Sequence, residues 1–313
     1  MKIFLAGASG AVGRSLIPML REHGHEVVGT TRTPQKADAL RKLGAEPVVL
    51  DALDRSAVLR AVAAAEPDAI VHQMTALSNL SDFRKFEREF AMTNRLRTEG
   101  TDNLLAAAKA SGVERVIAQS YAGWPYARTG GPVKTENDPL DSDPPKQMRT
   151  TLDAIRHLEQ SVTGAGGVVL RYGGFYGPGT GMAPGGSQWE TVRARKFPVV
   201  GDGGGVWSFT HVEDAATATV AALERWTPGE VYNAVDDEPA RVSEWLPALA
   251  AAIGAKPPRR IPRWMARPMG AHLVVMMCEV RGASNGKART KLDWTPRWPT
   301  WREGFERLGA TKA

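Results

Sequence analysis

Residues 2–23 read KIFLAGASGAVGRSLIPMLREH, and this stretch decides the fold. The first five residues form a short apolar run typical of a buried strand, and the pattern after Ala11 is typical of an amphipathic helix. Between them lie Gly7, Gly10 and Gly13. Glycine lets a turn tighten and lets the backbone approach a phosphate, while the helix N-terminus offers unpaired N–H groups. The stretch predicts a dinucleotide-binding loop; the alternative is a turn with a purely structural role.

The following segments repeat this alternation of strand and helix. Further strands are predicted at 26–30, 47–50, 69–73, 115–119 and 167–171, and helices at 11–23 and 95–111. This alternation predicts an α/β fold with a Rossmann-type, doubly wound parallel sheet. After residue 172 the chain becomes rich in Gly and Pro, which indicates a smaller, mixed substrate-binding region. We therefore expect a cofactor domain at 1–172, to which 212–235 return, and a substrate-binding region at 173–211 and 236–313.

The end of the second predicted strand bears on the choice of cofactor. A site specific for NAD usually carries a carboxylate there, but this chain reads TTRTPQK at 30–36. Arg32 and Lys36 could hold a 2′-phosphate, because a guanidinium matches phosphate oxygens. NADP(H) is therefore the preferred cofactor and NAD(H) remains possible; Arg32 could also be an ordinary surface residue. Asp51 follows the third strand and could meet the adenine, although a helix N-terminus near Asp54 explains it as well.

Four further segments carry a family resemblance. They read NRLRTEGTDNLL at 94–105, LRYGGFYGPG at 170–179, FTHVED at 209–214 and YNAVDDEP at 232–239. With the Gly-x-x-Gly-x-x-Gly loop, they make the chain resemble the extended short-chain dehydrogenases/reductases, the NAD(P)-dependent epimerase/dehydratase group. The resemblance implies a homodimer built through the 95–111 helix and its neighbour. The cofactor-binding residues expected from the loop and the resemblance are Gly7, Ser9, Gly10, Ala11, Val12, Gly13, Thr31, Arg32, Lys36, Asp51, Ala52, Met74, Asn94 and Tyr172.

The chain departs from this family at the acid/base residues. Family reductases and epimerases use a Tyr whose pKa is lowered by a Lys four residues later on the same helix face. Overlaying 151–159 on the family helix puts Thr151 at the tyrosine position and Ile155 at the lysine position. Tyr121, with Ser120 as a hydrogen-bond partner, is the candidate for a relocated proton donor; alternatively, Tyr121 only shapes the pocket.

These observations favour an NADP(H)-dependent oxidoreductase acting on a hydrophobic carbonyl, enone or ring compound. The alternatives are a cofactor-sensing binding protein without hydride transfer and a non-redox cyclase or isomerase. Residues 264–277 are expected to form one helix with a Met-rich apolar face, which either meets the substrate or packs in the core. The candidate substrate-binding residues are Trp124, Phe175, Trp189, Trp207 and Met269.

Composition limits the other classes. The 313 residues, 42% of them hydrophobic, can bury a sizeable core, and the basic residues behind the net charge of +6 are scattered rather than clustered, which argues against nucleic acid. The apolar run at 269–278 is too short to span a membrane. The single cysteine, Cys278, cannot form an internal disulfide, and no metal-ligand spacing is present, so we expect a cytoplasmic protein without a metal. His211 and Asp214 are expected to be capping and core residues.

Overall fold

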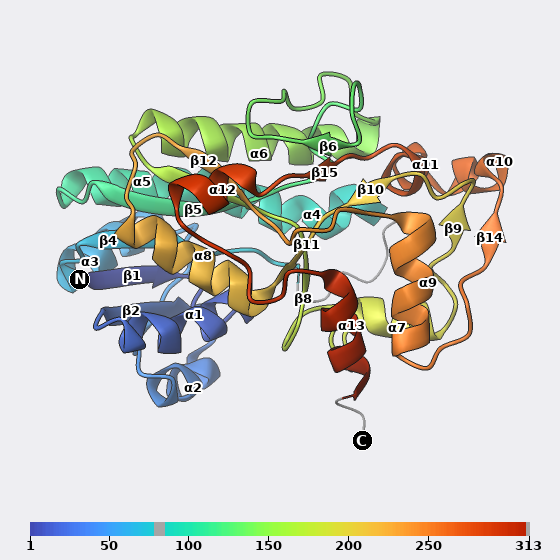
Figure 1. Cartoon of the computed structure of the whole chain (residues 1–313). Coiled ribbons are helices and arrows are strands. Elements are labelled where there is room, and N and C mark those ends of the chain that lie inside the picture. Colours follow the sequence, from blue (N-terminus) through green and yellow to red (C-terminus); the bar gives the residue numbers. More distant parts are fainter. Residues whose placement is uncertain (78–84, 311–313) are drawn as a thin grey trace.

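The computed structural model describes residues 1–77 and 85–310. At its centre is a seven-stranded parallel sheet with the strand order β12-β7-β5-β4-β1-β2-β3, which is a Rossmann-type arrangement (Figure 1). The predicted strands are confirmed, with ends displaced by at most two residues. The strands are β1 (Lys2–Ala6), β2 (Glu26–Thr31), β3 (Glu46–Val49), β4 (Ala69–His72), β5 (Arg115–Tyr121), β7 (Val168–Tyr172) and β12 (Val231–Ala234).

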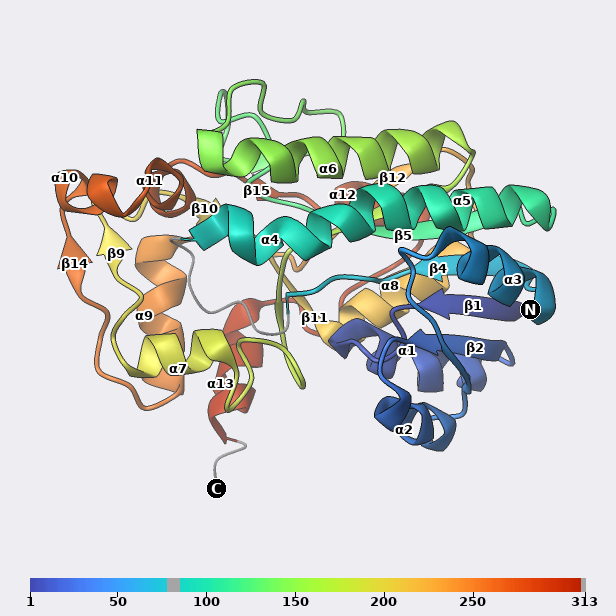
Figure 2. The same ribbon diagram turned by 180° about the vertical axis from the view of Figure 1, so that it is seen from behind.

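Helices cover both faces of the sheet because alternate strand residues point in opposite directions. In β1, Ile3 and Leu5 pack in one core cluster with residues of α1 and α8, whereas Phe4 and Ala6 pack in another with residues of α3 and α5. Figure 2 shows α4, α5 and α6 running across the top of the molecule. The flanking helices are α1 (Ala11–Glu22), η1 (Pro34–Lys36), α2 (Ala37–Lys42), α3 (Arg55–Ala65), α4 (Phe86–Arg95), η3 (Leu96–Gly100), α5 (Thr101–Ala110), α6 (Lys146–Gly164), α8 (Val212–Glu224) and α12 (Gly286–Lys291).

The strand order creates a crevice at the carboxyl edge of the sheet. From β1 the chain first builds outward through β2 and β3, and then returns to add β4 on the other side of β1. The connection from β1 to α1 and the connection from β4 to α4 therefore leave toward opposite faces of the sheet. In doubly wound folds a ligand binds outside the carboxyl ends of the strands at such a point.

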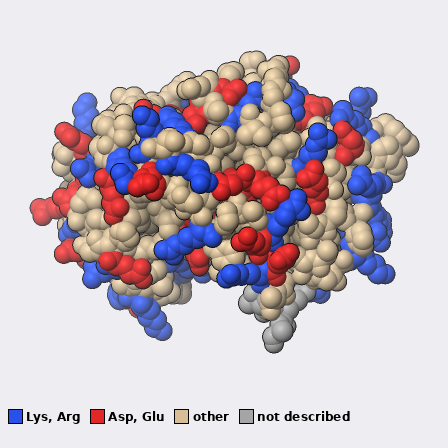
Figure 3. Space-filling view, in the orientation of Figure 1, with Lys and Arg blue, Asp and Glu red and all other residues tan. Residues whose placement is uncertain are grey.

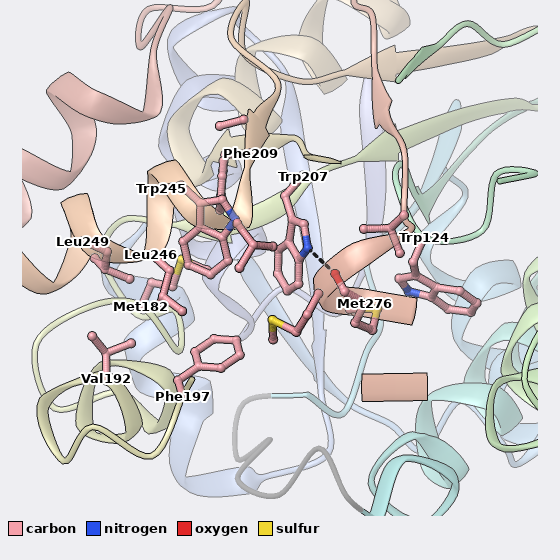
Figure 4. Packing of buried hydrophobic residues seen from close by; sticks show 14 of the residues in the cluster. Trp124, Met182, Val192, Phe197, Trp207, Phe209, Trp245, Leu246, Leu249 and Met276 are labelled. Atoms are coloured by element: carbon pink, nitrogen blue, oxygen red, sulfur yellow. Dashed lines mark hydrogen bonds between the residues drawn. The ribbon is translucent and has the colours of Figure 1, made fainter. Parts of the chain in front are cut away.

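The second half of the molecule lies beyond this edge, on the right of Figure 1. It is built from short strand pairs and helices around a core of aromatic side chains. In Figure 4 the indole of Trp245 packs against both Trp207 and Phe209, with ring centroids 5.0 and 5.3 Å away. The elements are β6 (Val133–Lys134), β8 (Gly174–Tyr176), α7 (Ser187–Arg193), β9 (Val199–Val200), β10 (Val206–Trp207), β11 (Phe209–His211), β13 (Ala240–Arg241), α9 (Val242–Ala252), β14 (Arg260–Ile261), α10 (Arg263–Ala266), η4 (Arg267–Met269), α11 (Ala271–Cys278), β15 (Gly282–Ala283) and α13 (Trp301–Ala310).

The prediction of one helix over 264–277 is wrong. The chain forms α10, a turn of 3-10 helix and α11, because Pro268 cannot continue an α-helix and Gly270 adopts a φ of 132°. The expected common face is therefore broken. Trp264 is 70% exposed and Met269 is 39% exposed, whereas Met276 is buried.

Charged side chains of both signs are interspersed on the face shown in Figure 3. Among the described residues, no helix combines the length and the apolar character needed to cross a membrane.

A buried ion pair joins α6 to β7 beneath the sheet edge. Arg171 donates from Nε and Nη2 to the two carboxylate oxygens of Glu159, at 2.8 and 2.6 Å. Both side chains are less than a tenth exposed. Glu159 also accepts a 2.6 Å hydrogen bond from Ser120, and Arg171 donates to the hydroxyl of Tyr126. This network ties the end of β5 to the helix that covers it.

Replacing Glu159 by Gln should lower the free energy of unfolding by about 3–5 kcal/mol, because Arg171 would keep a buried charge without its partner. Urea unfolding followed by circular dichroism measures this. The matched control is Glu99→Gln, which removes a half-exposed carboxylate paired with Arg95 at 2.7 Å and should leave the unfolding midpoint unchanged. Equal losses in the two variants would contradict the role given to burial.

Candidate active site

A continuous cavity of about 580 Å³ follows the carboxyl edge of the sheet into the second half of the molecule. One end is lined by the turn after β1, and the middle by the segments after β4 and β5. The far end is lined by aromatic and methionine side chains. Their elements come from both halves of the chain, so the cavity forms only when the second half packs on the sheet.

The turn after β1 has the geometry of a phosphate cradle. Gly7 has a φ of 93°, and a Cβ there would lie 2.7 Å from the carbonyl carbon of Gln73, so a side chain is excluded on both grounds. A Cβ at Gly13 would lie 2.6 Å from the carbonyl oxygens of Gly7 and Ala8. Gly10 precedes α1 without a side-chain cap, which leaves the first N–H groups of this helix directed toward the cavity end. These residues fit a diphosphate, which a helix N-terminus stabilises.

Basic side chains stand where the second strand ends. Arg32 and Lys36 are exposed and line the cavity, and neither forms an ion pair within the described ranges 1–77 and 85–310. Thr31 is buried, and its hydroxyl accepts a hydrogen bond from the Thr33 backbone. Asp51 instead accepts a bond from the backbone N–H of Leu53 and lies outside the cavity lining.

The structure brings most of the predicted site residues to this cavity and leaves others elsewhere. Tyr172 is fully buried and shares a 2.8 Å hydrogen bond with Thr219, and Trp189 is buried in the core of the second half. The predicted residues that line the cavity are Gly7, Ser9, Gly10, Ala11, Val12, Thr31, Arg32, Lys36, Ala52, Met74, Tyr121, Trp124, Phe175 and Trp207. Those outside the lining are Gly13, Asp51, Asn94, Ser120, Tyr172, Trp189 and Met269.

Tyr121 lies on the cavity wall at the end of β5, with a buried arginine nearby. Burial raises the pKa of Tyr121 to about 12, and the guanidinium of Arg97 acts in the opposite direction. Burial lowers the pKa of Arg97 to about 10, so that its side chain is still a cation at neutral pH. Arg97 comes from η3, the short π-helical turn between α4 and α5, and is 4% exposed.

The two α6 residues expected from the sequence to occupy the family acid/base positions, Thr151 and Ile155, are packed away from solvent. Thr151 is fully buried, and its hydroxyl accepts a 3.1 Å hydrogen bond from the Asn94 side chain of α4. Ile155 is also fully buried and belongs to the core cluster of the second half. No tyrosine in the sequence is followed four residues later by a lysine.

Two polar residues of the FTHVED segment, His211 and Asp214, have structural roles, as expected. His211 precedes α8 and accepts from the backbone N–H of Glu213. Asp214 accepts from the backbone N–H groups of Arg297 and Trp298, at 2.7 and 3.1 Å. These bonds fix α8 and the segment before α13.

Sequence reasoning missed several lining residues, of which Arg97 is the most consequential. An arginine in a predicted amphipathic helix is ordinarily read as a solvated residue, and nothing in the sequence marks the π-helical turn that buries it. Phe86 and Phe90 are stacked with ring centroids 4.3 Å apart, and Phe86 meets Trp124 edge-on at 5.8 Å. Their spacing of four could have indicated one helix face, but not that the face borders the cavity.

The fold, the phosphate cradle and the cavity at the sheet edge define a nicotinamide dinucleotide-dependent oxidoreductase of the Rossmann class. The family model described as the NAD dependent epimerase/dehydratase family matches residues 3–234. The chain therefore belongs to this family.

Comparison with curated relatives agrees with this assignment. The chain is 44% identical over 311 residues to a 3-diazoavenalumate denitrifying reductase from a Streptomyces species, covering 98% of this chain and 100% of that protein. It is 28% identical over 266 residues to a 2-alkyl-3-oxoalkanoate reductase from Stenotrophomonas maltophilia (strain K279a), covering 82% and 76% of the two chains. Both relatives carry the name of a reductase.

The fold is also that of a solved structure. UDP-glucose 4-epimerase from Thermotoga maritima, determined with UDP-glucose, is similar with a TM-score of 0.78 at 21% identity, covering 99% of this chain and 98% of that chain. The arrangement of sheet and second half is thus shared with an epimerase of different sequence.

His72 holds together two segments that line the cavity. It ends β4 and is 1% exposed. Its Nδ1 accepts from the backbone N–H of Met74, and its Nε2 is 3.3 Å from the carbonyl oxygen of Leu96, so the neutral ring with the proton on Nε2 satisfies both contacts. Burial lowers the pKa of His72 to about 4.

Stability should therefore fall as the pH decreases from about 6.5 to 4. In that window the unfolded chain binds a proton at His72 that the folded protein does not, which costs roughly 3 kcal/mol of unfolding free energy once complete. Urea unfolding at a series of pH values would compare the wild type with His72→Asn, whose side-chain oxygen can replace Nδ1 as an acceptor. The variant should lose less stability across the window, and parallel profiles would refute the assignment.

Proposed function

We propose that this protein is an NADPH-dependent reductase that removes the nitrogen of an aromatic diazo compound as N2. The observation that carries this proposal is an aromatic-walled cavity beside a phosphate cradle, in a chain that has no tyrosine followed four residues later by a lysine. The relative at 44% identity is named a 3-diazoavenalumate denitrifying reductase, and this name supports the same chemistry.

Reduction of a diazonium group explains why a proton donor is unnecessary. A reduced nicotinamide, when bound, supplies a hydride, which is a proton together with two electrons. The substrate loses its carbon–nitrogen bond, gains a carbon–hydrogen bond and releases N2, while the positive charge of the diazonium is neutralised by the hydride. A ketone, in contrast, becomes an alkoxide that must be protonated. The acid that the family supplies therefore has no task here.

The protein's own residues would bind and orient the aromatic substrate. Phe86, Trp124 and Trp207 offer flat apolar surfaces to an aromatic ring. Figure 4 shows the indole of Trp207 held in place by its 2.8 Å hydrogen bond to the Met276 carbonyl oxygen. This wall supports the hydrophobic, ring-containing substrate expected from the sequence.

The proposed reaction predicts that the hydrogen of NADPH appears in the ring. With NADPH deuterated at both C4 positions and the diazonium salt of 3-aminocinnamate, mass spectrometry should find cinnamate carrying one deuterium, with N2 released in equal amount. Tyr121→Phe should leave this turnover within a few-fold of the wild type. NADPH oxidation without labelled product, or no oxidation, would refute the proposal.

A ketone or enone is the second candidate substrate, and the neighbourhood of Tyr121 favours it. The charge of Arg97 favours the phenolate form of Tyr121, as the family lysine does for its tyrosine. If Tyr121 donates the proton, with Ser120 held by Glu159 behind it, Tyr121→Phe would lower the rate on such a substrate by about 10²-fold. The same variant thus separates the two candidates.

We further propose NADP(H) over NAD(H), because Arg32 and Lys36 line the cavity next to the end of β2 and have no carboxylate partner among residues 1–77 and 85–310. The nearby basic residue Arg41 already pairs with Asp38 and does not line the cavity.

Replacing Arg32 by Ala should raise the Kd for NADPH about 10- to 100-fold and leave that for NADH nearly unchanged, because one charged hydrogen-bond set is lost. Calorimetric titration of each cofactor measures this without any substrate. Arg41→Ala is the control and should bind both cofactors as the wild type does. Equal weakening of NADPH and NADH in Arg32→Ala would contradict the phosphate role.

The remaining expectations concern assembly. We propose that residues 1–172 and 212–235 act as the cofactor half and 173–211 and 236–313 as the substrate half. We also propose a cytoplasmic homodimer formed through α5 and its neighbouring helix, as the family resemblance implies.

A further inference from the structure

Arg97 is a buried cation to which the described part of the chain offers no partner. Within residues 1–77 and 85–310 it forms neither a hydrogen bond nor an ion pair, and its Nη1 is fully enclosed without an acceptor. It is 4% exposed, yet it contributes to the cavity wall. A buried guanidinium ordinarily has a carboxylate or carbonyl partner, because an unpaired buried charge is strongly unfavourable. Because Arg97 lines the cavity, a ligand bound there can supply a partner for its charge.

The nearest negative charge of the protein is already committed. Glu159 favours the charged form of Arg97, but both of its oxygens accept from Arg171, and one also accepts from Ser120. This buried group of residues therefore comprises two guanidinium cations, those of Arg97 and Arg171, and one carboxylate, that of Glu159. One positive charge remains uncompensated on the cavity side of this network.

The phosphates of the cofactor are unsuited as the partner. The cradle that fits them is formed by Gly7, Gly10 and Gly13 after β1, whereas Arg97 stands by Tyr121 at the end of β5. The strands β1 and β5 are separated by β4. The cavity that Arg97 lines also has apolar wall residues, Leu96, Met74 and Phe86 among them. An anionic group on an aromatic body would match both the charge and the wall.

We propose that Arg97 binds a carboxylate of the substrate, so that the enzyme selects aromatic carboxylic acids. A guanidinium presents paired N–H donors that match the two oxygens of a carboxylate, and the low polarity of the surroundings strengthens the bond. The inference rests on the proposed function for the aromatic body of the substrate. Arg97 would then determine substrate specificity, although it is not one of the residues of the family's acid/base chemistry.

The test measures binding and needs no turnover. Enzyme saturated with NADPH is titrated calorimetrically with cinnamate, with cinnamamide and with phenol. The wild type should bind cinnamate about 10- to 100-fold more tightly than cinnamamide, which is the range expected for one set of charged hydrogen bonds. It should bind phenol no more tightly than cinnamamide. Arg97→Gln should lose the preference for cinnamate, and Arg97→Lys should keep only part of it, because a lysine lacks the fork.

The control is Arg95→Gln, two residues away on the exposed side, where Arg95 pairs with Glu99. It should retain the full preference. Thermal unfolding checks that Arg97→Gln folds, and NADPH titration checks that its cofactor site is intact. Equal affinity of the wild type for cinnamate and cinnamamide, no detectable cinnamate binding, tighter binding of phenol, or a preference that survives in Arg97→Gln would each overturn the proposal.

The outcome is separable from that of the proposed reaction. A preference for cinnamate that depends on Arg97, together with no reduction of the diazonium salt, would refute the reaction and leave the carboxylate site standing. Reduction of the diazonium salt without any preference for cinnamate would refute the carboxylate site alone.

Discussion

The close approach of the turn after β1 to the backbone of Gln73 is the constraint on which the rest of the structure depends. Because Gly7 has no Cβ, β1 and β4 can lie side by side up to the point where both end. This point is also where the helix N-terminus of α1 meets the crevice. One close packing therefore sets the position of the phosphate cradle and the position from which the segment after β4, with Met74, enters the cavity.

The central sheet and its helices could be predicted because their signals are local. Short apolar runs, glycine at the first turn and regular helix spacing each lie within a few residues of the element they form. The same reasoning reached the residues of the cofactor end, such as Gly10 and Arg32. It failed at 264–277, where Pro268 and Gly270 outweigh an apolar spacing that otherwise fits one helix.

The substrate end could not be predicted in the same way because its residues meet only through tertiary packing. Arg97 and Tyr121 lie on different elements, and nothing in either segment indicates the other. Trp189 and Trp207 both fall in the Gly- and Pro-rich region, yet the first is enclosed in the core and the second borders the cavity. Local composition was able to indicate that aromatic residues belong to this half, but not which of them face a ligand.

The reaction and the carboxylate site that we propose together give a physical reason why no acid/base pair would be needed. A diazonium carboxylate is neutral overall, so its entry into an apolar cavity next to one guanidinium places a carboxylate beside the cation and adds no net charge. In the reaction that we propose, the hydride neutralises the diazonium, N2 leaves without charge, and the carboxylate keeps Arg97 paired throughout. Because this proposed reaction moves no proton, it does not require a titratable side chain of α6 at the site. Thr151 and Ile155 are then free to pack α6 against its neighbours, which is where the structure has them.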